Sequence, residues 1–250
     1  MPFLIFAFMQ DQGCGLDRCF LCRHTSPEWK DLTALKKTTL VFKKGRTIIR
    51  EGEPVKGIFF INAGAVKVSK TWGDQKELIL RFARTGDVLG HRGFGGDLHY
   101  PMSATALEDT RVCFIDNGFL NASMAANPGL MFQLLQLYAS ELQRAEKRMR
   151  DLAHMDVKGR IVLALFELTE AFGTGEKNFI ALPVTRQDIA SYAGTTYETV
   201  FKFFTDLTKK RVLTTSGKSI KINNRRALET YLQEEPLNKK KALPLNRKKP

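Results

Sequence analysis

The sequence predicts an α+β protein with a β domain first, then one long helix, then a small helical unit that carries a hairpin. Short runs of β-branched and aromatic residues, separated by glycine, fill the first half of the chain. After Pro128, apolar residues recur at steps of three and four, which indicates a helix. Beyond Asp156, two helical patterns meet at a glycine and lead into a hairpin pattern. The chain has 250 residues, of which 43% are hydrophobic, so it is long enough for two domains with cores.

The β domain is expected in residues 25–127. Between about Thr38 and Asp116, stretches such as "GIFFINAGAVKV" and "ELILRFARTGDVLG" are apolar and short, and turn residues separate them. Short strands with such regular turn signals favour an all-β sandwich or barrel.

A long helix is expected in residues 128–155, with Pro128 as an early helical residue and a stop near "HMDVKG". One apolar stripe follows this helix at alternating steps of four and three. Such a stripe over about three heptads is typical of a helix that pairs with a copy of itself, so it predicts a homodimer. The alternative is that the stripe packs only on the chain's own β domain. The stripe consists of Met131, Leu135, Tyr138, Leu142, Ala145, Met149 and Leu152.

The third unit is expected in residues 156–235. The stretch "VKGRIVLALFELTEAFG" predicts one amphipathic helix, and "TRQDIASYAG" and "TYETVFKFFTDLTKKRVL" predict two more, joined at Gly194-Thr195. Thr185 and Asp188 have the spacing of a capping box, which marks a helix start. A hairpin is expected in "TTSGKSIKI". Two short helices around a glycine turn fit a helix-turn-helix, whose second helix enters the major groove of DNA.

The formal net charge of +13 is concentrated near the C-terminus. Residues 236–250 carry six Lys and Arg residues and no acid, so +7 remains for the other 235 residues. We expect these residues to form a basic, disordered tail that adds non-specific affinity for phosphate. The opening "MPFLIFAFM" is apolar but has only nine residues and no basic start. It predicts neither a signal peptide nor a membrane span, so the chain is expected in the cytoplasm.

The segment "LPVTRQDIASYAGTTYETVFKFFTDLTKKRVLTTSGKSIKI" closely resembles the DNA-binding segment of the CRP/FNR family of bacterial transcription regulators. The resemblance runs from about Phe42 to Ile222 and includes the weaker motifs "GDVLG" and "KGR". It implies a β-roll sensor domain of the cyclic-nucleotide-binding type, a long dimerisation helix and a winged helix-turn-helix. It also implies a homodimeric regulator, not an enzyme, that binds a palindromic operator in double-stranded DNA and has RNA polymerase as a partner.

The same resemblance implies which residues touch DNA. The second helix of the motif presents Tyr197, Glu198, Phe201 and Lys202 to base edges. A carboxylate such as Glu198 can accept from cytosine N4, and Lys202 can reach guanine or a phosphate. Many members of the family carry Arg or Ser where this chain has the two aromatic residues, so its half-site is expected to differ. The alternative for Glu198 and Lys202 is a solvated helix pair. The other expected DNA contacts are Thr185, Arg186, Gln187, Thr195, Thr196, Thr199 and Lys218.

The expected sensor loop departs from the cyclic-nucleotide pattern of the family. Members that bind cyclic nucleotides carry Gly-Glu for the ribose and, about ten residues later, Arg-Ser for the phosphate. Here His91 follows Gly90, and the place of Arg-Ser falls within Tyr100, Pro101 and Met102. The resemblance therefore predicts a ligand other than cAMP. Arg92 and the nearby glycines could cradle another anion, although such glycines more often form turns.

Three of the four cysteines lie within nine residues, in "CGLDRCFLC". Because a chain of this size does not need disulfides, Cys14, Cys19 and Cys22 are read as metal ligands or redox thiols of a reducing compartment. Their C-x4-C-x2-C spacing is known for iron–sulfur ligands. The FNR-like branch of the family resembles this plan, with a fourth cysteine in the β domain, and this implies an iron–sulfur cluster on Cys14, Cys19, Cys22 and Cys113.

Alternatives to the cluster remain open at this point. Zinc bound by Cys14, Cys19, Cys22 and His24 is one, a reversible thiol switch is another, and no role is a third. Residues 1–24 are therefore treated as a separate cysteine-rich segment. Two other functions are alternatives: an iron–sulfur or dithiol oxidoreductase, and a ligand-binding module without DNA binding. The chain has no nucleotide-cofactor fingerprint and no convergent acid–base pair, so the sequence favours a regulator that senses redox state, oxygen, nitric oxide or a small ligand.

Overall fold

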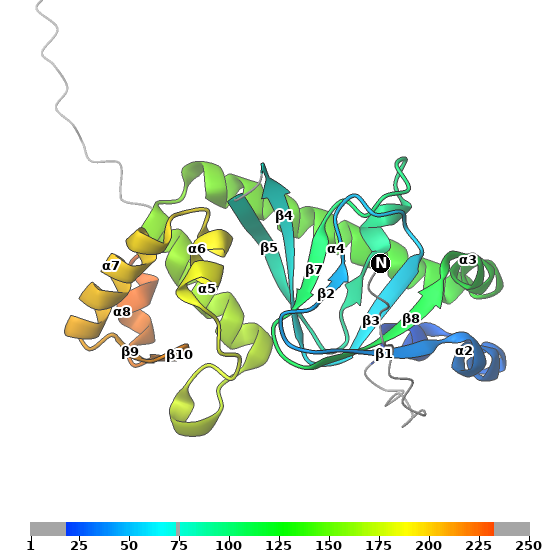
Figure 1. The fold of residues 1–250 in the computed structure, drawn as a ribbon, viewed down its shortest axis with the longest axis horizontal. Helices are drawn as coiled ribbons and strands as arrows, with labels where there is room; N and C mark the ends of the chain where they lie inside the picture. The colour runs from blue at the N-terminus through cyan, green and yellow to red at the C-terminus, as the bar shows by residue number, and fades with distance from the viewer. Residues whose placement is uncertain (1–18, 74–75, 233–250) are drawn as a thin grey trace, which may run out of the picture.

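A computed structural model describes residues 19–73 and 76–232 (Figure 1). It contains a β domain, a long helix that runs beside this domain, and a helical domain at the other end. The predicted α+β fold class and the predicted order of its parts are confirmed. Within the described residues, no helix combines the length and hydrophobicity that crossing a membrane would need.

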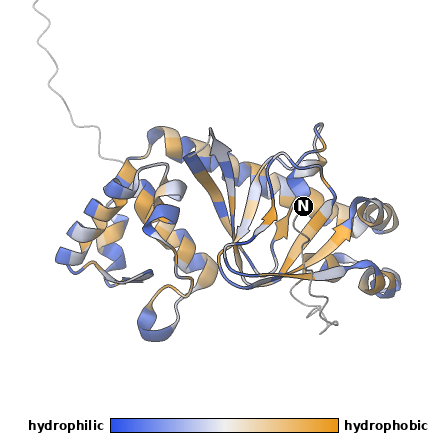
Figure 2. Ribbon diagram, in the orientation of Figure 1, coloured by the Kyte–Doolittle hydropathy of each residue, from blue (hydrophilic) through white to orange (hydrophobic). Residues whose placement is uncertain are grey.

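Two four-stranded antiparallel sheets form the β domain. The first sheet contains, in order, β1 (Thr38–Phe42), β8 (Thr110–Asp116), β3 (Gly57–Ala63) and β6 (Val88–Leu89). The second contains, in order, β2 (Thr47–Ile49), β7 (Ser103–Ala106), β4 (Ala65–Trp72) and β5 (Lys76–Arg84). Figure 2 shows β3 and β8 coloured as hydrophobic along most of their length. Apolar residues of both sheets, such as Ile61, Val66 and Val112, share one core, which confirms the predicted all-β architecture between Thr38 and Asp116.

Short helices before and after the strands were not predicted from the sequence. They are α1 (Phe20–His24), the 3₁₀ helix η1 (Pro27–Trp29), α2 (Lys30–Lys36) and α3 (Asn117–Ala126). Trp29 joins the two groups, because its ring stacks on Phe119 at 6.3 Å and its Nε1 donates to Ser123 Oγ at 3.0 Å. These helices form only with this packing, since α1 and α2 are too short to be stable alone.

The long helix α4 (Pro128–His154) has the predicted start and end. Its inner face packs on the β domain through Leu130 and Leu134. Most of the predicted stripe lies outside this contact: Met131, Leu135, Leu142 and Met149 are more than half exposed, and Ala145 is exposed. Two stripe members are half-buried instead, Leu152 and Tyr138, whose hydroxyl donates to the His91 carbonyl.

The helical domain begins with α5 (Val157–Phe172), which ends at Gly173 as predicted. It continues with the 3₁₀ helix η3 (Glu176–Asn178), α6 (Arg186–Ala193), α7 (Tyr197–Lys209), β9 (Leu213–Ser216), β10 (Ser219–Ile222) and α8 (Arg225–Glu229). The capping box of Thr185 and Asp188 is present, and Gly194 takes the left-handed conformation (φ +61°) that the turn between α6 and α7 requires. This is the predicted helix-turn-helix followed by a hairpin.

The helical domain packs on β4 and β5 of the second sheet, and one apolar cluster includes Ile79 and Phe82 together with the core of α5, α6 and α7. Phe82 stacks on Tyr192 of α6 with ring centroids 5.4 Å apart. Lys67 Nζ lies 3.1 Å from Asp188 Oδ1, and Arg84 Nη1 donates to the Ala171 carbonyl at 2.8 Å. As Figure 1 shows, α6 and α5 therefore face the sheet, and α7 lies on the far side of the helical domain.

Candidate DNA interface and sensor site

The outer face of α7 carries the side chains expected to read DNA. Glu198 and Lys202 lie one helical turn apart on this face, and both are exposed. Thr196 caps the helix, since its hydroxyl accepts the N–H of Thr199 at 3.3 Å. The opposite, buried row consists of Val200, Phe203, Phe204 and Leu207. The N-terminal half of α7 can therefore enter a groove without losing its contacts to the domain core.

The carboxyl group of Glu198 is kept ionised by its position at the start of α7. Hydrogen bonds from its own backbone N–H and from the Thr196 hydroxyl lower its pKa, and the charge of Lys202 acts in the same direction. An ionised carboxylate only accepts hydrogen bonds, which suits the amino group of cytosine.

The other predicted DNA contacts lie at the starts of α6 and α7 and in the hairpin turn. Thr185 is the N-cap of α6, and its hydroxyl accepts a hydrogen bond from the Asp188 N–H at 3.0 Å. The Arg186 guanidinium lies 5.9 Å from the Phe201 ring, so the start of α6 meets α7. The remaining residues predicted to contact DNA are all exposed or half-buried; they are Gln187, Thr195, Thr196, Thr199 and Lys218.

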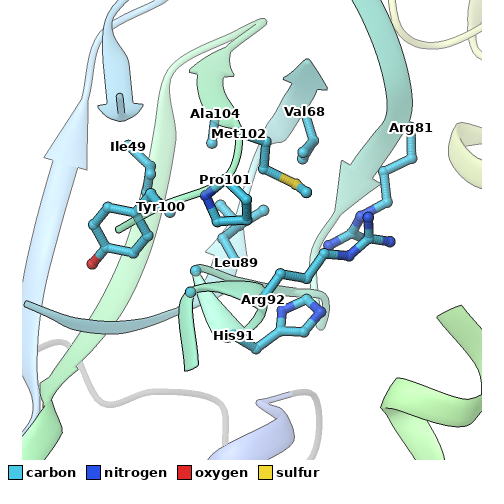
Figure 3. Close-up of a pocket in the computed structure, with 12 residues that line it drawn as sticks. Ile49, Val68, Arg81, Leu89, His91, Arg92, Tyr100, Pro101, Met102 and Ala104 are labelled. Atoms are coloured by element: carbon cyan, nitrogen blue, oxygen red, sulfur yellow. The ribbon is translucent and has the colours of Figure 1, made fainter. Parts of the chain in front are cut away.

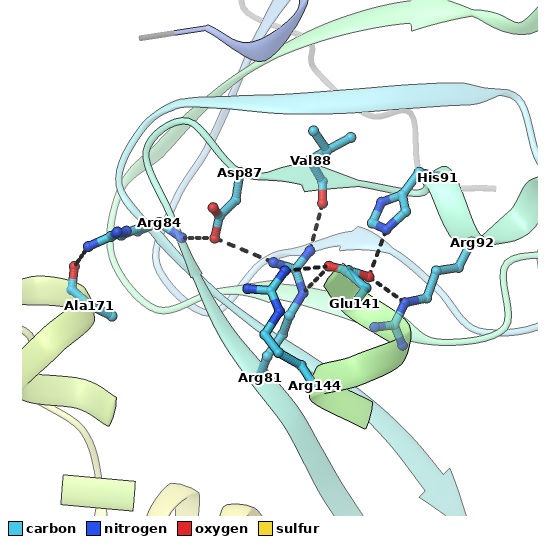
Figure 4. A network of polar contacts seen from close by, with 9 residues as sticks. All are labelled: Arg81, Arg84, Asp87, Val88, His91, Arg92, Glu141, Arg144 and Ala171. Carbon is cyan, nitrogen blue, oxygen red and sulfur yellow. Dashed lines mark hydrogen bonds and ion pairs between the residues drawn. The ribbon is translucent and has the colours of Figure 1, made fainter. Parts of the chain in front are cut away.

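A buried carboxylate joins α4 to the sensor domain (Figure 4). Glu141 is 4% exposed and accepts hydrogen bonds from His91 Nε2 at 2.8 Å and from Arg92 Nε at 2.7 Å. Arg81 Nε of β5 lies 3.5 Å from the other carboxylate oxygen. Burial alone would raise the pKa of Glu141, but the His91 hydrogen bond and the Arg81 charge outweigh it and hold the pKa well below its ordinary value. Glu141 is thus an ionised link between α4, β5 and the 3₁₀ helix η2 (His91–Phe94) that follows β6.

The sequence does not predict the Glu141 cluster, because Glu141 lies outside the apolar stripe of α4. One signal could have found it. Glu141 follows Leu134 by seven residues and Leu130 by eleven, so all three lie on the inner face of α4. A carboxylate on an inner face needs partners, and His91 and Arg92 were already singled out in the sensor loop.

A small cavity lies beside this cluster, and Figure 3 shows His91, Arg92 and Arg81 along its edge. Tyr100, Pro101 and Met102 also line it. Its volume is about 20 Å³, which is room for one water molecule. The positions where the family's Arg-Ser pair would fall are thus occupied by side chains that narrow the space.

Three of the four cysteines lie in one apolar core. Cys19 and Cys22, at α1, are buried together with Cys113 of β8, and Phe60 and Leu130 belong to the same cluster. The structure therefore brings together cysteines that are about 90 residues apart in the chain. Cys14 lies outside the described residues. His24, the ligand in the zinc alternative, is half-buried, with its ring 4.9 Å from that of Phe20.

The donor chemistry of this core fits a thiolate-bound group only in part. Three thiols from two segments of the chain are the ligand type that iron–sulfur clusters use. Among residues 19–73 and 76–232, however, no set of three or more His, Cys, Asp or Glu side chains is close enough to hold a metal ion. A site here would therefore need Cys14 and a closer approach of the three described thiols.

Two family models match the chain, that of the cyclic nucleotide-binding domain at residues 39–127 and that of the Crp-like helix-turn-helix domain at residues 159–231. The CRP-like cAMP-activated global transcriptional regulator of Mycobacterium tuberculosis (strain ATCC 25618 / H37Rv) is 30% identical over 185 residues, which cover 73% of this chain and 83% of that protein. The chain belongs to the CRP/FNR family. The predicted regulator of this type, and the prediction that it is not an enzyme, are confirmed.

Other CRP/FNR proteins are similar over most of their length. The fumarate and nitrate reduction regulatory protein of Escherichia coli (strain K12) is 29% identical over 221 residues, or 87% of this chain and 88% of that protein. The solved structure of FixK2 from Bradyrhizobium japonicum has a TM-score of 0.70 and 27% identity, and the match covers 80% of this chain and 98% of that one.

In this CRP/FNR protein, β5 contacts both the Glu141 cluster and the helix-turn-helix. Arg81 faces Glu141 of α4, whereas the next residue, Phe82, stacks on Tyr192 of α6. Arg148, near the end of α4, also reaches α6, with its guanidinium 3.7 Å from the Tyr192 ring centroid. Strand β5 of the second sheet therefore contacts α4 and the helix-turn-helix through two adjacent residues, Arg81 and Phe82.

Proposed function

We propose that this CRP/FNR regulator is a cytoplasmic homodimer that binds a palindromic operator, acts with RNA polymerase and responds to a redox signal such as oxygen or nitric oxide. One observation carries the proposal: Cys19 and Cys22 are buried with Cys113 in the core that also holds Leu130. Leu130 belongs to the first turn of α4. A chemical change at these thiols would thus act on the helix that lies between the sensor and DNA-binding domains.

The exposed stripe on α4 supports the dimer. Met131, Leu135, Leu142 and Met149 expose more than half of their surface, although they are large and apolar. Within the described residues, no other segment covers them, and a second copy of α4 would bury them on both chains. A two-fold dimer places two recognition helices on successive turns of DNA, and this accounts for a palindromic site.

Replacing Glu198 with alanine tests sequence-specific binding. Full-length protein is used to select its preferred site from random DNA, first as the wild type and then as Glu198→Ala. We expect the variant to lose discrimination at one position in each half-site, at a cost of about 1–3 kcal/mol, because the carboxylate no longer accepts from a base.

The control is Glu176→Ala, which removes an exposed acid of η3 and changes the net charge equally. It should leave the selected site unchanged. Recovery of the same site by Glu198→Ala with undiminished discrimination would contradict the role of Glu198. The absence of any enriched site for the wild type would contradict DNA recognition and favour a ligand-binding module.

We propose further that cAMP is not the signal. The Mycobacterium tuberculosis relative is named as cAMP-activated, but the cavity of this chain, at about 20 Å³, has room for only one water molecule. Tyr100 and Met102 stand in that space, and the Tyr100 ring is fixed by its hydroxyl, which donates to the Gly57 carbonyl at 2.8 Å. Glu141 is already the anionic partner of both His91 and Arg92.

The cofactor that we propose is an iron–sulfur cluster held by Cys14, Cys19, Cys22 and Cys113. Such a cluster would supply a centre that oxygen and nitric oxide attack. The chain's part is to bury three of the thiols in an apolar core, which limits access of water. Relatives named as the fumarate and nitrate reduction regulatory protein and the transcriptional activator FnrA support this choice.

Protein purified without oxygen should be brown, because thiolate-to-iron charge transfer absorbs visible light. Serine at any one of the four cysteine positions should reduce this absorption and the iron content. Absorption and metal analysis of the same preparation provide the measurement. A colourless protein with stoichiometric zinc would favour the zinc site with His24, and a metal-free protein with a reversible disulfide would favour the thiol switch.

A further inference from the structure

Two aromatic rings stand exposed on the recognition helix. Tyr197 is 42% exposed and Phe201 is 48% exposed, although α7 already has a complete buried row on its other side. The rings are one helical turn apart and nearly parallel, with centroids separated by 6.2 Å and planes inclined by 19°. Neither residue belongs to the apolar core of the helical domain. The pair therefore forms a small apolar surface that the fold of the domain does not require.

The neighbours of this surface are charged groups suited to DNA. Glu198 and Lys202 each follow one of the two rings in the sequence, so they form a parallel row on the helix. The Arg186 guanidinium, at the start of α6, lies 5.9 Å from the Phe201 ring. Its Nε is buried and has no hydrogen-bond partner within the described part of the chain. An apolar strip thus lies between cationic and anionic side chains on one exposed face.

Only one apolar group is presented by bases in the major groove, the C5-methyl group of thymine. Cytosine, adenine and guanine present polar groups and small ring C–H edges there, so the exposed rings would lose water against them with less apolar contact in return. We propose that Tyr197 and Phe201 form a thymine-reading surface, which contacts the methyl group of one or two thymines next to the base pair that Glu198 contacts. This inference rests on the proposed DNA-binding function and specifies which bases it selects.

Deoxyuridine provides the test, because it keeps the base pairing and O4 of thymine but lacks the methyl group. The operator selected by the full-length wild type is remade with each thymine replaced in turn. At one or two positions per half-site, binding should weaken about fourfold for each methyl group removed. Phe201→Ala should bind the normal operator more weakly and should lose this response to deoxyuridine.

Trp72→Ala serves as the matched control, since it removes an exposed aromatic ring on β4, outside the helix-turn-helix. It should keep the full deoxyuridine penalty. Phe201→Leu, which retains an apolar side chain, should keep part of it, and unchanged thermal unfolding of both Phe201 variants shows that they fold. A wild type that binds a defined site but tolerates deoxyuridine everywhere would overturn the inference, as would an unchanged penalty in Phe201→Ala. If no defined site exists, the proposed DNA-binding function fails instead.

Discussion

Replacement of Glu141 by glutamine is expected to lower the free energy of unfolding by about 3 kcal/mol, although glutamine has nearly the same volume. The carboxylate is buried and faces His91, Arg92 and Arg81 at 2.8, 2.7 and 3.5 Å. Without its charge, the Arg81 guanidinium keeps Asp87, at 3.4 Å, as its one anionic partner among the described residues. Removing one member of a buried ion pair leaves the remaining charge uncompensated, which costs more than the lost hydrogen bonds alone. Chemical denaturation of the full-length chain at one protein concentration measures the difference.

Glu146→Gln is the control for this substitution, because Glu146 lies on the same helix but is exposed. It removes the same charge and should change the free energy of unfolding by less than about 0.5 kcal/mol. Equal effects of the two substitutions would mean that Glu141 contributes only through the net charge of the helix. That result would contradict the ionised link between α4 and the sensor domain.

The stability that Glu141 provides should depend on pH in a defined direction. Its pKa in the folded chain lies below the ordinary value of 4.5, so the folded state favours the ionised form. This contribution is complete above the ordinary value and is lost as the pH falls below it. The difference between the wild type and Glu141→Gln should therefore be constant near neutral pH. It should shrink as the pH falls below about 4.5, because Glu141 then takes up a proton in the unfolded chain while it stays ionised against Arg81, Arg92 and His91 in the folded one.

Local signals made much of this fold predictable from the sequence. The capping box of Thr185 and Asp188 and the left-handed Gly194 act over a few residues, so the helix-turn-helix follows from them directly. The periodicity after Pro128 likewise fixes α4, since each of its turns repeats the same pattern.

Long-range contacts account for what the sequence could not predict. His91 and Glu141 are separated by 50 residues, and their hydrogen bond exists only when α4 docks on the β domain. Helices α1 and α2 have five and seven residues, too few for a periodic pattern, and they depend on the stack of Trp29 on Phe119. The apolar core around Cys19 and Cys113 also depends on long-range contacts, because it packs α1 against the middle of β8.

Replacement of Leu142 by glutamate should dissociate the dimer and lower operator affinity by at least about 100-fold. Leu142 lies in the middle of the exposed stripe, so a two-fold axis near this point would bring the two new carboxylates together in an apolar interface. A monomer engages one half-site and loses the gain from simultaneous binding of the second. Sedimentation measures the mass, and titration of operator DNA measures the affinity.

The matched control for Leu142→Glu is Gln143→Glu, which adds the same charge at the neighbouring position. Gln143 lies off the stripe, in a groove that it shares with Phe20 and Leu137, so the dimer and the operator affinity should change little. Leu142 is 61% exposed within one chain, and its replacement should therefore leave the β domain and the helix-turn-helix folded. A Leu142→Glu protein that sediments as a dimer and binds the operator normally would contradict pairing through the stripe. The exposed residues of α4 would then need another partner, and the spacing between the two recognition helices would have to be set elsewhere in the protein.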